Sequence, residues 1–301
     1  MTTHFRSTVT PIVAALLLGV SAGCHASDRE FNRDVAADPS GTVEISNVSG
    51  KLRVIGWDKP TVSVHATLES GVDRVDVITS KGRTVVKVVR PSMSFRGNGD
   101  ADIEVHVPRQ SEVEATATSA DLASSQILGS QRLRTVSGNL RADIAADFEG
   151  KTVSGDMRLR GSAQKVDMRL SSVSGDITLD HGTGDIDATS ISGEIRVEVD
   201  QAHEVRLHST SGDLTFRGSL VDGATIEADT VSGDVTLRPR APAGFEYEAT
   251  SFSGDINNCL GGNAEATSRH GPGTRLNGRT GDGKGRLRVK SLSGDLEICD
   301  H

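Results

Sequence analysis

The chain has 301 residues, a formal net charge of −8 and an aromatic content of only 3%. It is long enough to bury a sizeable core, in one large domain or in two ordinary ones. The acidic balance provides no basic stripe for phosphates, and one Trp and one Tyr offer few rings on which bases could stack, so we expect no nucleic-acid partner.

The first 24 residues have the layout of a secretory signal peptide. A polar start with Arg6 is followed by an apolar run over residues 12–20, too short to span a bilayer, and by small residues up to Cys24. The sequence "SAGC" resembles a bacterial lipobox, in which the chain is cut before the cysteine and the thiol receives lipid. We predict a signal peptide over residues 1–24, lipidation of Cys24 and anchoring to a membrane of the cell envelope. Ordinary cleavage after Ala26 is the alternative, and both routes export the protein.

The next two segments precede the regular part of the sequence. Residues 25–40 are polar and predict a flexible tether. Residues 41–110 contain runs of alternating apolar residues, such as "TVEISNVSGKLRVIGW" and "ADIEVHVP", without a strict period. We expect them to form an irregular N-terminal β-rich cap, which covers the open end of the sheets that follow.

From residue 111 to residue 301 the chain repeats a unit built around Ser-Gly-Asp, as in "TVSGDMRLRG" and "TVSGDVTLRP". Successive glycines of these units are 17 to 21 residues apart, except for a last step of 40, and Ala120 replaces the glycine in a degenerate first copy. The glycines are Gly138, Gly155, Gly175, Gly193, Gly212, Gly233, Gly254 and Gly294. A period near 20 indicates a repeat architecture, in which each unit buries its apolar face by stacking on its neighbours.

Apolar residues alternate with polar ones on both sides of each glycine. Met168 and Leu170 lie seven and five positions before Gly175, and Ile177 lies two positions after it. A period of two predicts two short strands per unit, each with one face inward. We therefore predict an all-β protein folded as a single-stranded parallel β-helix (β-solenoid), with coils about 4.8 Å apart. The apolar residue two positions before the glycine, such as Val173, is expected to share the inward parity of the strand that follows.

The Ser-Gly-Asp triplet predicts the corner between the two strands of a unit. Glycine can take the positive φ that a sharp corner requires, Asp can accept hydrogen bonds from local backbone amides, and Ser hydroxyls align in columns when coils stack. The corner residues that we single out are Ser154, Gly155, Asp156, Ser174, Gly175, Asp176, Ser232, Gly233, Asp234, Ser293, Gly294 and Asp295.

The doubled step before Gly294 indicates an insertion. Residues 260–284 contain no triplet, and we interpret them as a loop inserted into one coil. Cys259 and Cys299 each lie five positions after a corner glycine, so adjacent coils would bring their α-carbons within disulfide range. We predict a disulfide between Cys259 and Cys299, which would hold the last coil at an edge without a neighbour.

These motifs resemble the bacterial DUF4097 family of adhesin-like proteins. The resemblance covers most of residues 41–300 and rests on the recurrent "SGD" corners, on "LRVIGW" and "IEVHVP", and on the ending "SFSGDINNC…GRTGDGKGRLRVKSLSGDLEIC". It implies a β-helical, exported or membrane-tethered bacterial protein of a family with no established enzymatic activity, and it provides no catalytic residues.

Two other functions compete with that of an interaction module. Acidic residues follow the corner glycines, as at Asp176 and Glu194, and calcium between stacked carboxylates would relieve their repulsion, although capping of the turn amides explains them better. A polysaccharide-active lyase or hydrolase would need an isolated carboxylate pair, and none stands out from the repeat. We therefore expect an interaction module, either adhesin-like or an accessory in envelope sensing, that is not an enzyme and has no cofactor. It would present outward residues and the loop 260–284 to an envelope protein or a glycan.

Overall fold

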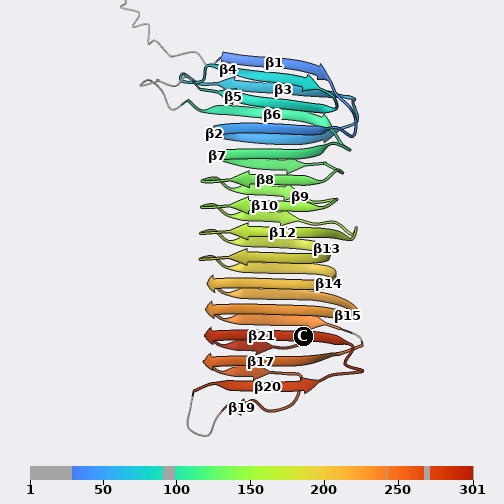
Figure 1. The fold of residues 1–301 in the computed structure, drawn as a ribbon, viewed down its shortest axis with the longest axis vertical. Coiled ribbons are helices and arrows are strands. Elements are labelled where there is room, and N and C mark those ends of the chain that lie inside the picture. The colour runs from blue at the N-terminus through green and yellow to red at the C-terminus, as the bar shows by residue number, and fades with distance from the viewer. Residues whose placement is uncertain (1–28, 91–98, 242, 268–271, 301) are drawn as a thin grey trace, which may run out of the picture.

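The computed structural model describes residues 29–90, 99–241, 243–267 and 272–300. The predicted signal peptide, its lipidation site Cys24 and residues 25–28 lie outside these ranges. Every element of the described residues is a β-strand, which confirms the all-β class, and none of them forms a helix able to cross a membrane. The molecule is an elongated rod of stacked coils (Figure 1).

The middle of the rod is the regular part. Its strands are β8 (Gln131–Thr135), β9 (Leu140–Asp143), β10 (Phe148–Thr152), β11 (Met157–Arg160), β12 (Val166–Ser172), β13 (Ile177–Ser190), β14 (Ile195–Ser211) and β15 (Leu214–Ser232). Strands that end at a Ser-Gly corner, such as β8, β10 and β12, form one face of the rod, which we call the pre-corner face. Strands that begin after the corner, such as β9 and β11, form the opposite, post-corner face. Both faces are parallel and in register, so equivalent residues of successive coils lie side by side.

Inward side chains form continuous apolar files between the two faces. One file on the post-corner face consists of Leu140, Met157, Ile177, Ile195, Leu214, Val235 and Leu296, all at most 1% exposed. Each such side chain contributes about 1.5–3 kcal/mol when it is fully buried. The alternation read from the sequence therefore marks the core.

The apolar residues two positions before the corner glycines do not face the core. Their side chains are 39–52% exposed, whereas the Ser or Thr one position earlier is buried. The expected inward parity was wrong at these positions, because the strand keeps its parity up to that hydroxyl residue and the chain reverses only at the glycine. Seven large apolar side chains consequently line the corner edge: Val136, Val153, Val173, Ile191, Val231, Phe252 and Leu292.

Antiparallel strands close the N-terminal end of the rod. The strands of this end are β1 (Arg29–Ala36), β2 (Thr42–Trp57), β3 (Thr61–Leu68), β4 (Arg74–Ser80), β5 (Arg83–Val89), β6 (Ala101–Pro108) and β7 (Glu112–Ser125). The first coil, formed by β2, is not the outermost one but lies between other strands. Strand β2 pairs in parallel with β7 on one side and with β5 and β6 on the other. Strands β3 and β4 then run antiparallel to β6 and β5 and cover them.

The expected tether over residues 25–40 is structured from Arg29 to Ala36. These residues form β1, which pairs antiparallel with β3. Phe31 and Val35 pack partly buried against the core, and these two contacts outweigh the polar character of the rest of the segment. The tether prediction was therefore wrong for this strand.

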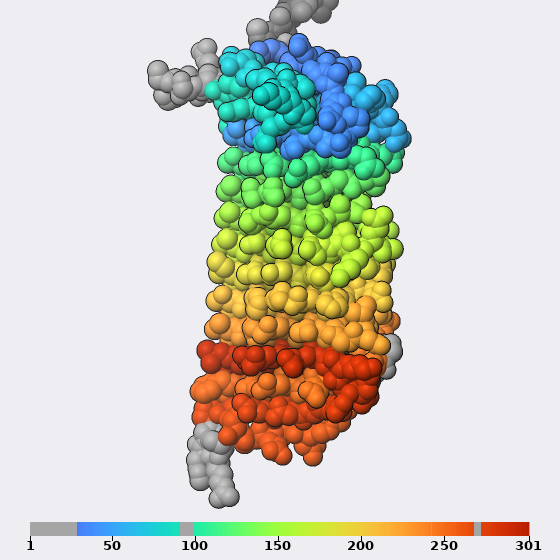
Figure 2. All heavy atoms as spheres, turned by 45° about the vertical axis from the view of Figure 1, so that its right-hand side comes forward, coloured from blue at the N-terminus to red at the C-terminus, as the bar shows by residue number. Residues whose placement is uncertain are grey.

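The C-terminal end has the corresponding arrangement. Its strands are β16 (Val235–Arg240), β17 (Phe245–Ser253), β18 (Ile256–Asn258), β19 (Glu265–Ala266), β20 (Thr274–Arg279), β21 (Gly285–Ser293) and β22 (Leu296–Ile298). The last strand pair, β21 and β22, lies between the coil of β15 and β16 and the coil of β17 and β18. Figure 2 shows this order at the surface, where a dark red band separates two orange ones. The stacking order therefore departs from the order of the sequence.

The segment 260–284 is more than an inserted loop. It contains β19 and β20, and β20 pairs antiparallel with β17 at the end of the rod. The strand covers the backbone that β17 would otherwise expose as a template for aggregation.

The predicted disulfide is confirmed. Cys259 and Cys299 are bonded, with their α-carbons 4.8 Å apart. The bond closes a separation of 40 residues, which corresponds to about 4 kcal/mol in the chain-entropy model. It joins the outer coil of β17 and β18 to the inserted last coil, so the expectation that the last coil is the unneighboured edge was wrong.

The stacking order makes a direct prediction about neighbours on the pre-corner face. Asp229 and Thr250 both lie opposite Lys290, on its two sides. In a background with Cys24→Ser, the pair Asp229→Cys and Lys290→Cys should form a disulfide, found by mass spectrometry of a non-reduced digest. The pair Asp229→Cys and Thr250→Cys is the control: its α-carbons are about 9–10 Å apart and should stay unbridged. The opposite result would mean that the coils stack in sequence order.

Candidate ligand-binding site

The predicted corner residues lie in vertical files along one edge of the rod, at the left in Figure 1. The glycines are required because the coils approach closely. A Cβ on Gly155 would lie 2.2 Å from the carbonyl oxygen of Gly138, and a Cβ on Gly175 would lie 2.2 Å from that of Gly155. Positive φ, the expected reason, applies to Gly233 (144°), Gly254 (153°) and Gly294 (149°) but not to the other corner glycines.

The acidic residues after the glycines form a hydrogen-bond ladder between coils. The backbone amide of Asp234 donates to Oδ1 of Asp213 at 2.9 Å, and that of Asp295 donates to Oδ1 of Asp234 at 2.8 Å. The amides therefore belong to the neighbouring coil, not to the same turn as expected. The same bond links Asp176 to Asp156, at 3.4 Å.

The ladder removes the reason for a calcium ion in this column. A carboxylate that accepts a backbone amide has its charge partly satisfied without a metal. Glu194, which is one methylene longer, instead accepts from Arg196 at 2.5 Å. Within the part of the chain that the structure describes, no group of three His, Cys, Asp or Glu side chains could hold a metal ion.

The Ser residues of the triplet face outward. Ser154, Ser174, Ser232 and Ser293 are all exposed at the corner. The hydroxyl residues two positions earlier form a second, buried file inside the same edge, in which Ser251 donates to the carbonyl oxygen of Gly294 at 3.1 Å. The two predicted columns of hydroxyls are therefore present, one exposed to solvent and one buried.

A second ladder, of ion pairs, crosses the N-terminal half of the pre-corner face. Arg83 bridges Glu44 and Glu114 at 2.6 and 3.2 Å. Arg132 bridges Glu114 and Glu149 at 2.6 and 2.9 Å. Hydrogen bonds from Lys151 first, and then from Arg132 and Arg134, lower the pKa of Glu149 to about 2.

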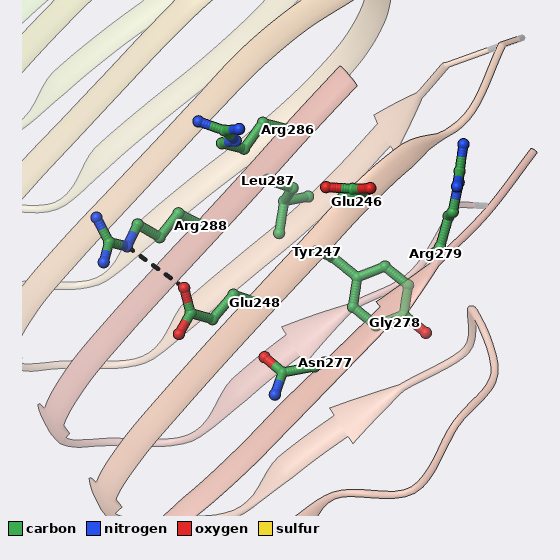
Figure 3. Close-up of a pocket in the computed structure, with 9 residues that line it drawn as sticks. All are labelled: Glu246, Tyr247, Glu248, Asn277, Gly278, Arg279, Arg286, Leu287 and Arg288. Carbon is green, nitrogen blue, oxygen red and sulfur yellow. Dashed lines mark ion pairs between the residues drawn. The ribbon is translucent and has the colours of Figure 1, made fainter. Parts of the chain in front are cut away.

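A recess lined by charged side chains lies at the other end of the same face. We call it the Arg286 cleft; it has a volume of about 590 Å³ and is lined by residues 246–248 of β17, 277–279 of β20 and 286–288 of β21 (Figure 3). Glu246 lies in register between Arg279 and Arg286, and Glu248 lies between Asn277 and Arg288. The cleft thus exists because β20 returns antiparallel beside β17.

The base of the cleft is fixed by one tyrosine and one glycine. Tyr247 points inward, is 5% exposed, and donates from Oη to the carbonyl oxygen of Gly261 at 2.7 Å. A Cβ on Gly278 would lie 2.0 Å from that hydroxyl oxygen. Glycine at this position lets β20 lie directly over the ring and so places its polar side chains in the cleft.

The cleft is a basic region on an acidic protein. The outward side chains of β17, β20 and β21 comprise five cations, Arg275, Arg279, Arg286, Arg288 and Lys290, and two carboxylates, Glu246 and Glu248. These strands therefore have a local excess of three positive charges, although the whole chain carries −8.

The arginines of the cleft differ in their partners. Arg288 forms an ion pair with Glu248 at 3.7 Å, and Arg279 donates to the carbonyl oxygen of Asp282. Arg286 has no carboxylate within 4.0 Å and no hydrogen-bond acceptor among the residues that the structure describes. It is therefore the guanidinium with its donors free for a ligand, and a guanidinium binds carboxylates and phosphates in bidentate geometry.

The sequence pattern did not predict these residues as a site. Residues 260–284 were expected to form a loop, and Arg286 and Arg288 occupy the polar positions of an ordinary strand. The period-two alternation in "TRLNGR" (residues 274–279) was the available signal for β20. Nothing in the sequence indicated that β20 pairs antiparallel with β17.

Comparison with known proteins identifies the family. The family model described as "Toastrack DUF4097" matches residues 58–222 and 205–299. The chain therefore belongs to the DUF4097 family, as its motifs indicated. No curated protein matches it.

Solved structures resemble this chain to different degrees. A "putative adhesin" from Parabacteroides merdae ATCC 43184 aligns with a TM-score of 0.51 at 10% identity, covering 90% of this chain and 96% of that one. A second "putative adhesin", from Bacteroides fragilis NCTC 9343, covers 91% of this chain and 98% of its own at 12% identity, with a TM-score of 0.38. At such identity the first of these shows a shared fold alone.

The lowered pKa of Glu149 makes stability depend on pH. A carboxyl with a depressed pKa stabilises the folded state above its ordinary pKa of 4.5, and this stabilisation is lost as pH falls toward about 2. Glu149→Gln should therefore lower the free energy of unfolding by about 1–3 kcal/mol near pH 6, allowing for screening by solvent, and by almost nothing near pH 2. Urea unfolding of both proteins across this range measures the difference.

Glu198→Gln is the matched control for this titration. Glu198 is exposed and makes no ion pair within the described ranges, so its replacement should have the same small effect at every pH. A destabilisation by Glu149→Gln that stays constant from pH 6 to pH 2 would contradict the ion-pair ladder.

Proposed function

We propose that this protein is an exported, non-catalytic, envelope-anchored interaction module, and that its Arg286 cleft binds the carboxylate groups of an acidic glycan. The observation that carries the proposal is the Arg286 guanidinium, which lies inside a basic cleft and has no acidic partner among the described residues. Membership in the DUF4097 family and the adhesin names of its structural neighbours support a binding role at a cell surface.

Export and anchoring rest on separate features. The N-terminal segment has the layout of a secretory signal, and "SAGC" places Cys24 where a lipoprotein is modified. The Cys259–Cys299 disulfide is typical of a protein that folds in an oxidising compartment. Labelled palmitate should be incorporated by the wild type and not by Cys24→Ser, and equal labelling of both would contradict the anchor.

The cleft suits an extended acidic polymer better than a small metabolite. It is open on the outer face of a sheet, and the cations continue along β20 and β21 to Arg275 and Lys290, which both lie opposite Thr250. A polymer with regularly spaced carboxylates can contact several of these cations at once, and each added contact raises the overall affinity. The Asn277 amide adds a donor and an acceptor for sugar hydroxyls.

The cleft is a poor candidate for polysaccharide cleavage. A glycosidase needs one carboxyl group that is shielded from water and protonated, beside a second that stays ionised. Glu246 is exposed, and Glu248 is held by Arg288 at 3.7 Å. Neither group therefore has the environment of a general acid, which supports the non-catalytic proposal.

Binding to defined polymers tests the proposal. Polygalacturonate should bind in a calorimetric titration, more weakly as salt is added, and neutral dextran should not bind. Arg286→Ala should weaken the binding about 10- to 100-fold, since a hydrogen bond to a charged group contributes about 1.5–3 kcal/mol. The control Arg141→Ala removes one exposed positive charge from the post-corner face and should leave the affinity within about twofold.

Three results would contradict the proposal. Equal losses in Arg286→Ala and Arg141→Ala would place binding outside the cleft. No binding of the acidic polymer, with recovery of an envelope protein by crosslinking in intact cells, would replace the glycan by that protein. New reducing ends or unsaturated sugars in the incubated polymer would show an enzyme.

A further inference from the structure

The corner edge carries an apolar row that the core does not use. The row consists of the seven residues exposed two positions before the corner glycines, and we call it the corner ridge. In stacking order they are Val136, Val153, Val173, Ile191, Val231, Leu292 and Phe252, with Thr210 between Ile191 and Val231. In each repeat the three residues after the ridge residue are Ser, Gly and an acidic residue or Asn. The exposed apolar residue is therefore confined to one position of the corner.

Isolated exposed apolar residues are ordinary on protein surfaces, but a contiguous row is not. Neighbouring members of the ridge belong to adjacent coils about 4.8 Å apart, except Ile191 and Val231, which the coil of Thr210 separates. The ridge spans eight levels and is roughly 35 Å long. With 39–52% of each side chain exposed, the ridge presents an apolar area on the order of 500 Å². That area is in the range of the largest patches on monomeric proteins, which are commonly binding surfaces.

We propose that the corner ridge is the interface of a homodimer, in which two copies of this chain pack ridge against ridge. The ridge is straight and repeats at the strand spacing, so a second copy matches it at every level at once. Two copies would remove about 1,000 Å² of apolar surface, and the serines beside the ridge would add a polar rim. The total buried area is at the lower end of the range for specific protein–protein interfaces. We therefore expect a weak dimer with a Kd in roughly the micromolar range.

The charges beside the ridge select the relative direction of the two rods. The acidic ladder, with Asp176, Asp213 and Asp234, runs along only one side of the ridge, because it follows the glycine in each repeat. A two-fold axis parallel to the rods places the two ladders on opposite sides of the interface. An axis perpendicular to the rods would place them side by side, where like charges repel. The same ladder disfavours an anionic membrane as the occupant.

Single cysteines on the ridge test both the interface and its direction. In a background with Cys24→Ser, the variants Val136→Cys, Val173→Cys and Val231→Cys should each form a disulfide-linked dimer on mild oxidation, because parallel rods place every level opposite itself. Antiparallel rods would allow only a level near the middle of the ridge to react. Arg141→Cys, exposed on the post-corner face, is the control and should stay monomeric.

Sedimentation equilibrium measures the association without a crosslink. Val173→Asp combined with Val231→Asp should raise the dimer Kd at least tenfold while leaving the melting temperature almost unchanged, since both side chains are exposed. The proposal is overturned if the wild-type protein stays monomeric up to about 100 μM, if the double variant dimerises equally well, or if the protein floats with phosphatidylcholine vesicles through the ridge and does not dimerise. These outcomes are independent of glycan binding at Arg286.

Discussion

The close approach of stacked backbones at the corner glycines is the constraint on which the rest of the structure depends. At Gly155, Gly175 and Gly193 a side chain would occupy the space of a carbonyl oxygen in the adjacent coil, at 2.2 to 2.3 Å. Because the corners pack this tightly, the strands on both faces remain in register. Because the coils are in register, apolar side chains form continuous files in the core. For the same reason, each Asp side chain lies within hydrogen-bond distance of a backbone amide in the next coil.

The two ends of the rod protect their edge strands from pairing with other chains in the same way. In each case one coil is inserted between neighbours that are not adjacent in sequence, β2 at one end and β21 with β22 at the other. Antiparallel strands then cover the outermost parallel ones. This arrangement leaves the regular faces free, so that the ion-pair ladder, the Arg286 cleft and the corner ridge occupy separate parts of one rigid scaffold.

Much of the interior could be predicted from the sequence, because inward residues obey a period of two that repeats from Gly138 to Gly294. The Cys259–Cys299 pairing followed from equal offsets to the corner glycines. The outward direction of the Val173 side chain and its equivalents could not be predicted. The inward-outward alternation of side chains shifts at one residue of the corner, and the sequence does not show at which one. The stacking order could not be predicted either: β17 and β21 carry the same pattern, and either would fit against β15. The cleft depends on that order and on β20, so its residues were inaccessible to sequence reasoning.

The most direct test of the central claim is a comparison of two glycine substitutions. A Cβ on Gly193 would meet the carbonyl oxygen of Gly175 at 2.3 Å. The atoms nearest to a Cβ on Gly182 would be side-chain carbons of Met168, Leu179 and Val199, at 3.2 to 3.4 Å. Urea unfolding should show that Gly193→Ala lowers the free energy of unfolding by about 2–4 kcal/mol. Gly182→Ala should change it by about 1 kcal/mol or less. Equal effects, or a Gly193→Ala protein as stable as the wild type, would contradict the account.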